Sequence, residues 1–136
     1  MSIISIGLSG MLAAQAQVQA SAANIVHANS EGRIPVAGSP QPDDVYQPVD
    51  VVTFDVGKGG KPASIGYSYV PRSGGFSVVH DPDSPVANAS GDVATPNVDL
   101  ATEMVSMVQA KYQFYASAMV VRVGEQMMRA TINMVA

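Results

Sequence analysis

The first thirty residues contain no Asp, Glu, Lys or Arg, yet apolar side chains recur along them at helical spacing. Alternating steps of four and three residues keep a stripe on one side of a helix, where it can pack on a partner. A single exposed helix normally carries charges on its outer face, but the remaining positions here are mostly Ala, Ser, Gln and Asn. We therefore expect a helix over about residues 2–29 that contacts protein on most sides, which favours assembly over catalysis. Its stripe consists of Ile4, Leu8, Met11, Gln15, Val18, Ala22 and Ile25.

Residues 100–135 repeat this rhythm at the other end of the chain. At roughly 1.5 Å per residue the second helix would span about 50 Å and the first about 40 Å. The short segment between them cannot bury both, so we predict that they pair as a coiled coil, each burying its stripe on the other, and leave surface for neighbouring subunits. We expect Asp99 to cap the second helix and Glu103 to lie near the positive end of its dipole. Its stripe consists of Leu100, Met104, Met107, Lys111, Phe114, Ala118, Val121, Glu125, Met128, Ile132 and Val135.

The middle of the chain, residues 33–94, has a different pattern and separates an N-terminal axial segment (1–32) from a C-terminal one (95–136). Gly32 is expected to end the first helix, and four prolines between residues 33 and 48 exclude another one there. Period-two alternation predicts strands near residues 50–56 and 65–70, joined by a glycine-rich turn at 57–60, and a third strand at 76–80. The predicted fold is mainly α with a small β insertion.

Composition excludes several classes of function. Only 13% of the residues are charged, against roughly 25% in typical soluble domains, which suggests a surface that is largely covered in the working state. A net charge of −4 without a basic patch argues against nucleic-acid binding. The chain has no cysteine, so it has no disulfide and no thiolate metal site. We also predict no cleaved signal peptide and no membrane span, because the first basic residue is Arg33 and no uninterrupted apolar run approaches about 18 residues.

The polar clusters in the sequence have ordinary structural interpretations. His80, Asp81, Asp83 and Asp92 resemble a metal cluster, but prolines set turn geometry there and Asp is a normal turn residue. Neither histidine lies near a nucleophile motif, and the glycine-rich turn lacks the Gly-Lys-Ser/Thr sequence of a phosphate loop. We therefore expect no catalytic residue, metal or cofactor. The amides of Asn24, Gln15 and Gln17 either fix the register of the helices or are ordinary solvated positions; both interpretations stay open.

Two blocks resemble a known family. Residues 24–32, Asn-Ile-Val-His-Ala-Asn-Ser-Glu-Gly, are similar to the N-I-A-N-A-N-T-P-G segment that closes the first helix of flagellar rod, hook and axial proteins. Residues 79–107 resemble a Y-D-P-x-x-P-x-A, G-Y-V, P-N-V pattern that leads into E-M-V-x-M in the C-type proximal-rod subunits of the flagellar basal-body rod family. The chain departs from these patterns at Val26, His27, Glu31, Arg33 and His80.

This resemblance implies a structural subunit of the bacterial flagellar basal body. Such subunits assemble helically into the periplasmic proximal rod, which transmits torque from motor to hook, and they are exported by the flagellar type III route without a cleaved signal peptide. The implied partners are copies of the chain, other rod subunits, and membrane-ring, rod-base and export-gate proteins. The expected subunit interface is the apolar residues of the two stripes, with Gln15 and Asn24. The alternative is a cytoplasmic helical adaptor or chaperone of a flagellar or type III export system, which would carry the charged outer faces that this sequence lacks.

Overall fold

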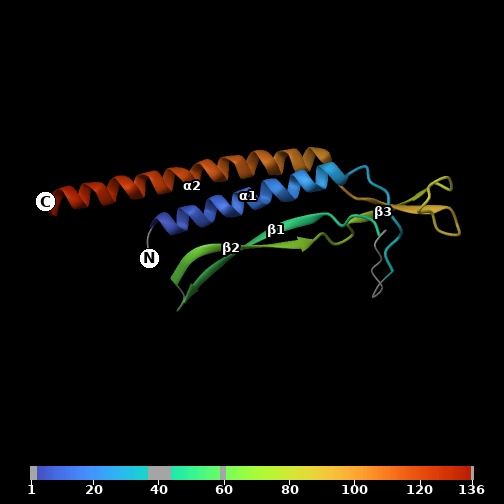
Figure 1. Ribbon diagram of the computed structural model, residues 1–136, viewed down its shortest axis with the longest axis horizontal. Helices are drawn as coiled ribbons and strands as arrows, with labels where there is room; N and C mark the ends of the chain where they lie inside the picture. The colour runs from blue at the N-terminus through green and yellow to red at the C-terminus, as the bar shows by residue number, and fades with distance from the viewer. Residues whose placement is uncertain (1–2, 37–43, 59–60, 136) are drawn as a thin grey trace.

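The computed structural model describes residues 3–36, 44–58 and 61–135. Long helices lie at both ends of the chain and two separate β-hairpins lie between them, so the predicted fold class is confirmed (Figure 1). The elements are α1 (Ile3–His27), β1 (Val49–Lys58), β2 (Lys61–Pro71), β3 (Phe76–His80), β4 (Asp92–Pro96) and α2 (Leu100–Val135). Ser2, residues 37–43 of the proline-rich segment and Gly59–Gly60 of the expected turn lie outside the described residues.

The helices α1 and α2 pack side by side and run antiparallel (Figure 1). Near one end of the pair, Gly7 packs against Val121, and near the other Asn24 bonds to Glu103. A Cβ atom on Gly7 would lie 2.5 Å from Cγ2 of Val121, so the absence of a side chain there sets how closely the helices approach. The buried residues of α1 are all small or polar: Gly7, Gly10, Ala13, Ala14, Ala16, Ala20, Ser21 and Asn24.

This packing corrects the prediction that each helix buries its apolar stripe on the other. Several buried positions of α1, including Gly7, Ala14 and Ser21, lie one residue before the predicted stripe positions. Leu8 is 51% exposed and Met104 is 57% exposed. Small residues occupy the interface between α1 and α2 because they let the two backbones come close. The helices then gain dispersion contacts along the whole pair. The larger side chains then lie outside it.

The first hairpin covers a second side of α1. β1 and β2 pair antiparallel, and Ser9 Oγ of α1 accepts a hydrogen bond of 2.9 Å from the backbone N–H of Ile65. The hydroxyl of Tyr69 lies 3.3 Å from Oε1 of Gln19. Helix α1 is therefore sandwiched between α2 and the hairpin (Figure 1), which explains why it needs no charged face.

The second hairpin, β3–β4, projects from the opposite end of the molecule to the C-terminus (Figure 1). The predicted third strand at 76–80 is confirmed, and β4 follows it at residues 92–96, where we predicted no particular strand. β4 was missed because it is short, although Val93 and Ala94, in the middle of its pairing with β3, are fully buried. Gly32 exchanges backbone hydrogen bonds of 3.0 and 2.9 Å with Ala94.

Gly32 has a different role from the helix stop that we predicted. The helix already ends at His27, and Ser30 caps it by donating from its N–H and its hydroxyl to the His27 carbonyl. A Cβ atom on Gly32 would lie 2.5 Å from the backbone nitrogen of Val45. The position thus requires glycine because the backbone at Val45 passes too close for any side chain.

Candidate assembly surface

A group of polar side chains lies where α1, α2 and the first hairpin meet, with Asn24 and Glu103 buried at its centre. We call it the polar node: Asn24, Tyr46, Asp50, Arg72 and Glu103, with the backbone of Val49. Asn24 is 1% exposed, and its amide nitrogen donates to the Val49 carbonyl and to Oε1 of Glu103, both at 3.0 Å. Its amide oxygen accepts from the Val49 N–H and the Tyr46 hydroxyl, also at 3.0 Å. All four hydrogen-bonding positions of the amide are therefore used.

Arg72 compensates the buried charge of Glu103. The Glu103 side chain is 3% exposed, and one Arg72 nitrogen lies 2.9 Å from its Oε1 and 2.6 Å from Oδ1 of Asp50. A second Arg72 nitrogen donates to Oδ2 of Asp50 at 3.2 Å, which completes a bidentate pair. The hydrogen bond to Asp50, with a further one to Glu103, raises the pKa of Arg72 against a lowering effect of desolvation. Burial, and then the charge of Glu103, raises the pKa of Tyr46.

The node joins the two sequence blocks that carried the family resemblance. Asn24 opens the first block and Glu103 opens the E-M-V-x-M segment, 79 positions further on. Two interpretations of the amide side chains were open. Asn24 is buried and bonded to the partner helix, whereas Gln15 is exposed and Gln17 is half-buried. Sequence reasoning assigned Glu103 only to the helix dipole and missed Tyr46, Asp50 and Arg72. No periodic pattern marks those residues.

The start of α2 follows the sequence prediction. Oδ1 of Asp99 accepts from the N–H of Ala101 at 3.0 Å, and Oδ2 accepts from the Thr102 hydroxyl at 2.7 Å. These two hydrogen bonds, led by the one from Thr102, lower the pKa of the Asp99 carboxyl. The cap fixes the first turn of α2, and Glu103 lies one turn further along.

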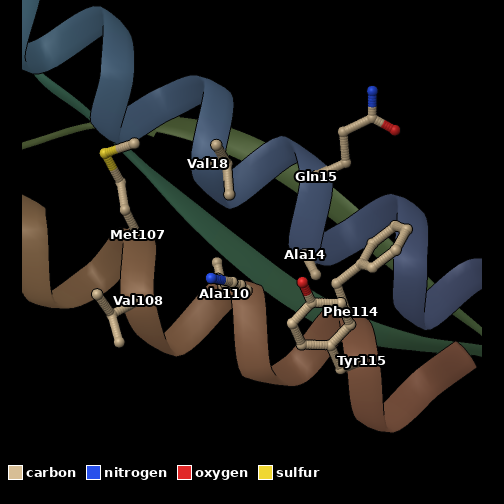
Figure 2. Close-up of a pocket in the computed structure, with 9 residues that line it drawn as sticks. Ala14, Gln15, Val18, Met107, Val108, Ala110, Phe114 and Tyr115 are labelled. Atoms are coloured by element: carbon tan, nitrogen blue, oxygen red, sulfur yellow. The ribbon is translucent and has the colours of Figure 1, made fainter. Parts of the chain in front are cut away.

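An apolar groove runs along the outside of the helix pair (Figure 2). It has a volume of about 540 Å³ and lies where the small Ala14 faces Ala110. Figure 2 shows Phe114 and Tyr115 of α2 at one end and Met107 and Val108 at the other, while the Gln15 side chain extends away from α2. Lys111 contributes the one charged side chain of the lining.

The structure places the predicted interface residues on the outside of the pair or at its margin. Leu8, Gln15, Leu100, Met104, Phe114, Met128 and Ile132 are exposed, and Ile4, Met11, Val18, Ala22, Ile25, Met107, Ala118 and Val121 are half-buried. Asn24 is buried, and Val135 is the last residue of α2. A single copy thus leaves most of the large side chains of its two longest elements accessible to another protein. Exposed apolar area of this extent marks a protein–protein interface in a soluble chain.

The histidines and nearby acids make local contacts. Nδ1 of His80 lies 3.0 Å from Oδ1 of Asp92 across β3 and β4, and the His27 ring stacks on Tyr46 with centroids 4.4 Å apart. Within residues 3–36, 44–58 and 61–135, no three His, Asp or Glu side chains gather into a possible metal site. Over the same part of the chain, neither helix is long and apolar enough to span a bilayer.

Comparison with known proteins agrees with this architecture. Residues 89–134 match the family described as flagellar basal body rod FlgEFG protein C-terminal. The flagellar basal-body rod protein FlgC of Salmonella typhimurium strain LT2 is 29% identical over 135 residues, which cover 98% of this chain and 96% of that protein. The protein of the same name in Escherichia coli O6:H1 is 35% identical over 57 residues, or 42% of each chain.

The fold defines an elongated assembly subunit whose terminal helices pair through small residues and present large apolar side chains outward. The chain is similar to flagellar basal-body rod proteins. The similarity that extends over nearly the whole chain is to FlgC proteins.

Proposed function

We propose that this chain is a structural subunit of the flagellar rod, assembled helically in the proximal rod, where it transmits torque from motor to hook. The observation that carries the proposal is the exposed apolar surface of the helix pair. The sequence similarity to FlgC, which covers 96% of the Salmonella protein, supports it. An adaptor or chaperone that works alone in the cytoplasm has no use for this surface. A rod subunit covers it with neighbours on several sides.

The polar node supports this role mechanically. It ties α1, α2 and the first hairpin to one another through hydrogen bonds that are buried or part-buried. Buried polar contacts of this kind have a narrow range of allowed geometry, so they oppose sliding of one element past another. A subunit that transmits torque needs this resistance to shear. The finer proposals of type III export without cleavage and of contact with membrane-ring, rod-base and export-gate proteins follow from the family resemblance.

The test is whether the chain is part of the rod in its own organism. We expect a deletion strain to lose motility, and we expect mass spectrometry of purified hook–basal bodies to find the chain in stoichiometric, salt-resistant amounts. Its absence from intact basal bodies would refute the structural role and would favour the export-adaptor alternative.

A point variant tests the exposed surface itself. Because Leu8 is 51% exposed in the single chain, Leu8→Ser should change the stability of the isolated subunit by no more than about 0.5 kcal/mol. We expect the same variant to reduce rod incorporation and swarming. Ser5→Ala, an exposed change on the same helix, provides the matched control. Normal swarming of Leu8→Ser would remove this part of α1 from the interface.

A further inference from the structure

The surface of α2 is rich in methionine. Six of the eight methionines of the chain lie in this helix. Met107 is half-buried, and the other five are between 47% and 85% exposed: Met104, Met119, Met127, Met128 and Met134. Methionine is among the residues most often found inside a folded chain, so five exposed thioethers on one helix are unusual. In a single copy of the subunit these sulfur atoms are open to small molecules in solution.

Methionines also line two apolar grooves along the helix pair. Met107 lies at one end of the groove of about 540 Å³ described above (Figure 2). A second groove, of about 420 Å³, lies near the start of α1, where Met127 and Met128 meet Ile3. The one side-chain hydroxyl among the described residues of this second lining, that of Thr131, already donates to the Met127 carbonyl at 2.9 Å. An oxygen atom added to either sulfur would therefore find no unused side-chain donor in that lining.

Thioethers are the preferred targets of oxidants in this chain, because it contains neither Cys nor Trp. Hypochlorous acid converts a thioether to a sulfoxide: in the net reaction an S=O bond forms, the O–Cl bond breaks, the sulfur is oxidised, chlorine is reduced to chloride and a proton is released. Methionine sulfoxide reductases reverse the change, since the oxygen leaves as water while a pair of reductase thiols forms a disulfide. The sulfoxide is polar, and it disrupts interfaces that methionine forms through its flexible apolar side chain.

We propose that the exposed methionines of α2 are sites of reversible oxidation by hypochlorous acid, and that their sulfoxides block assembly while the subunit stays folded. In the free subunit water solvates the sulfoxide oxygen, so the fold loses little. When a neighbour covers the surface, the oxygen loses this water without gaining a donor, and the contact is weakened. The free subunit is therefore the sensitive form. The inference rests on the proposed function, which supplies the covering neighbours, and adds to it a modification site and its consequence.

Oxidation of the purified full chain tests the assigned sites. After treatment with less than one equivalent of hypochlorous acid per methionine, mass spectrometry should find sulfoxide several-fold more often at Met104, Met119 and Met127 than at the half-buried Met11 and Met107. The oxidised chain should keep its far-UV circular dichroism spectrum, with Tm within about 2 °C of the untreated chain. Equal oxidation of exposed and half-buried methionines, or loss of the fold, would refute these sites.

Incorporation into basal bodies tests the consequence. The leucine variant keeps the apolar volume of α2 but removes its exposed thioethers, through Met104→Leu, Met119→Leu, Met127→Leu, Met128→Leu and Met134→Leu. Met11→Leu is the matched control, because this half-buried methionine lies on α1. Each chain is compared with itself in treated and untreated cells, which cancels any effect of leucine on assembly without oxidant.

A brief exposure of cells to hypochlorous acid should lower incorporation of the wild-type chain and of Met11→Leu several-fold, whereas the leucine variant should keep most of its incorporation. Overproduced methionine sulfoxide reductase should restore the wild-type chain. If the leucine variant does not assemble even without oxidant, Met127→Leu together with Met128→Leu, in the second groove, gives the same comparison. Equal losses by the wild-type and leucine-substituted chains would overturn the inference. Absence of every one of these chains from the basal bodies of untreated cells would instead refute the proposed function, and the oxidation of the purified chain would still decide the sites.

Discussion

Replacing Asn24 with alanine tests whether the polar node holds the three elements together. The substitution removes hydrogen bonds to the Val49 N–H and carbonyl, the Tyr46 hydroxyl and Glu103 Oε1. Glu103 keeps Arg72, so the loss falls on the Tyr46 hydroxyl and the two backbone groups of Val49, whose hydrogen bonds to Asn24 are all part-buried. Leaving buried groups unpaired costs about 1–3 kcal/mol each, and we expect a total of about 3 kcal/mol.

Thermal unfolding followed by far-UV circular dichroism measures this loss. For a domain of this size, 1 kcal/mol corresponds to a shift of about 4 °C in Tm, so Asn24→Ala should lower Tm by about 12 °C. Asn29→Ala is the matched control, because Asn29 belongs to the same sequence block but is exposed. If the two variants unfold within about 2 °C of each other, the node does not stabilise the fold and the reasoning above is wrong.

A second substitution at Asn24 separates geometry from charge. Asn24→Asp keeps the shape and the accepting oxygen, but it replaces the donor with an oxygen 3.0 Å from Oε1 of Glu103. Two carboxylates at this distance do not both stay ionised without strong repulsion, and a shared proton relieves it. We therefore expect Asn24→Asp to be less stable than wild type at pH 7 and to recover part of the difference as the pH is lowered toward about 5. A difference that does not change with pH would exclude direct contact of the two carboxylates.

Three further predictions concern the surroundings of the node. Arg72→Met should lower the free energy of unfolding, measured in urea, by about 3–5 kcal/mol, because it leaves the buried Glu103 carboxylate without its cationic partner. Asp50→Asn, at a half-exposed site, should lower it by about 1 kcal/mol or less. The pKa of Tyr46 is raised in the folded chain, so its stabilising effect is complete below the unfolded value of about 10 and is lost as the pH rises through the folded value. Tyr46→Phe should therefore lose less stability than wild type as the pH is raised above about 10. Gly32→Ala should lower Tm far more than Gly124→Ala, because the new methyl group meets the backbone of Val45 in the first case and only the Ile3 side chain in the second.

Each of these three has a result that would contradict it. Equal losses from Arg72→Met and Asp50→Asn would mean that the pair with Glu103 adds nothing. If Tyr46→Phe lost as much stability as wild type at alkaline pH, a group other than Tyr46 would be responsible for that loss. A soluble Gly32→Ala chain with normal Tm would mean that the segment containing Val45 can move away at little cost.

Periodicity predicted the elements well because long helices and alternating strands repeat one rule over many residues. The bounds of both helices, the Asp99 cap and the strands over residues 49–58, 61–71 and 76–80 followed from the sequence to within a few residues. What periodicity could not decide is which of two adjacent stripes faces the partner helix. Hydropathy favours the stripe of Leu8 and Met11, whereas close approach favours the stripe of Gly7 and Gly10, and the second outcome depends on the shape of both helices together.

The polar node was beyond sequence reasoning for a related reason. Its members are separated by up to 79 positions, and each taken alone has an ordinary explanation such as a helix end, a turn or a dipole. Only the family resemblance brought Asn24 and Glu103 into one argument, and it did so without linking them. The structure provides the link, since the two residues share a hydrogen bond that neither can replace with water.

The helix pair buries small residues between its helices and exposes large apolar ones, and this arrangement has a consequence for assembly. If Leu8 and Met104 were buried inside the chain, each subunit would satisfy its own hydrophobic surface and neighbours would have little to bind. By pairing α1 and α2 through Gly7, Gly10 and Ala14, the chain keeps a folded helix pair and still leaves the large side chains for contacts between subunits. Enlarging the small face should therefore damage the subunit itself, and Ala14→Leu, at a position 1% exposed, should unfold the helix pair in isolation. Trimming the large face should instead leave the subunit folded and impair only the rod, so the two classes of variant separate folding from assembly.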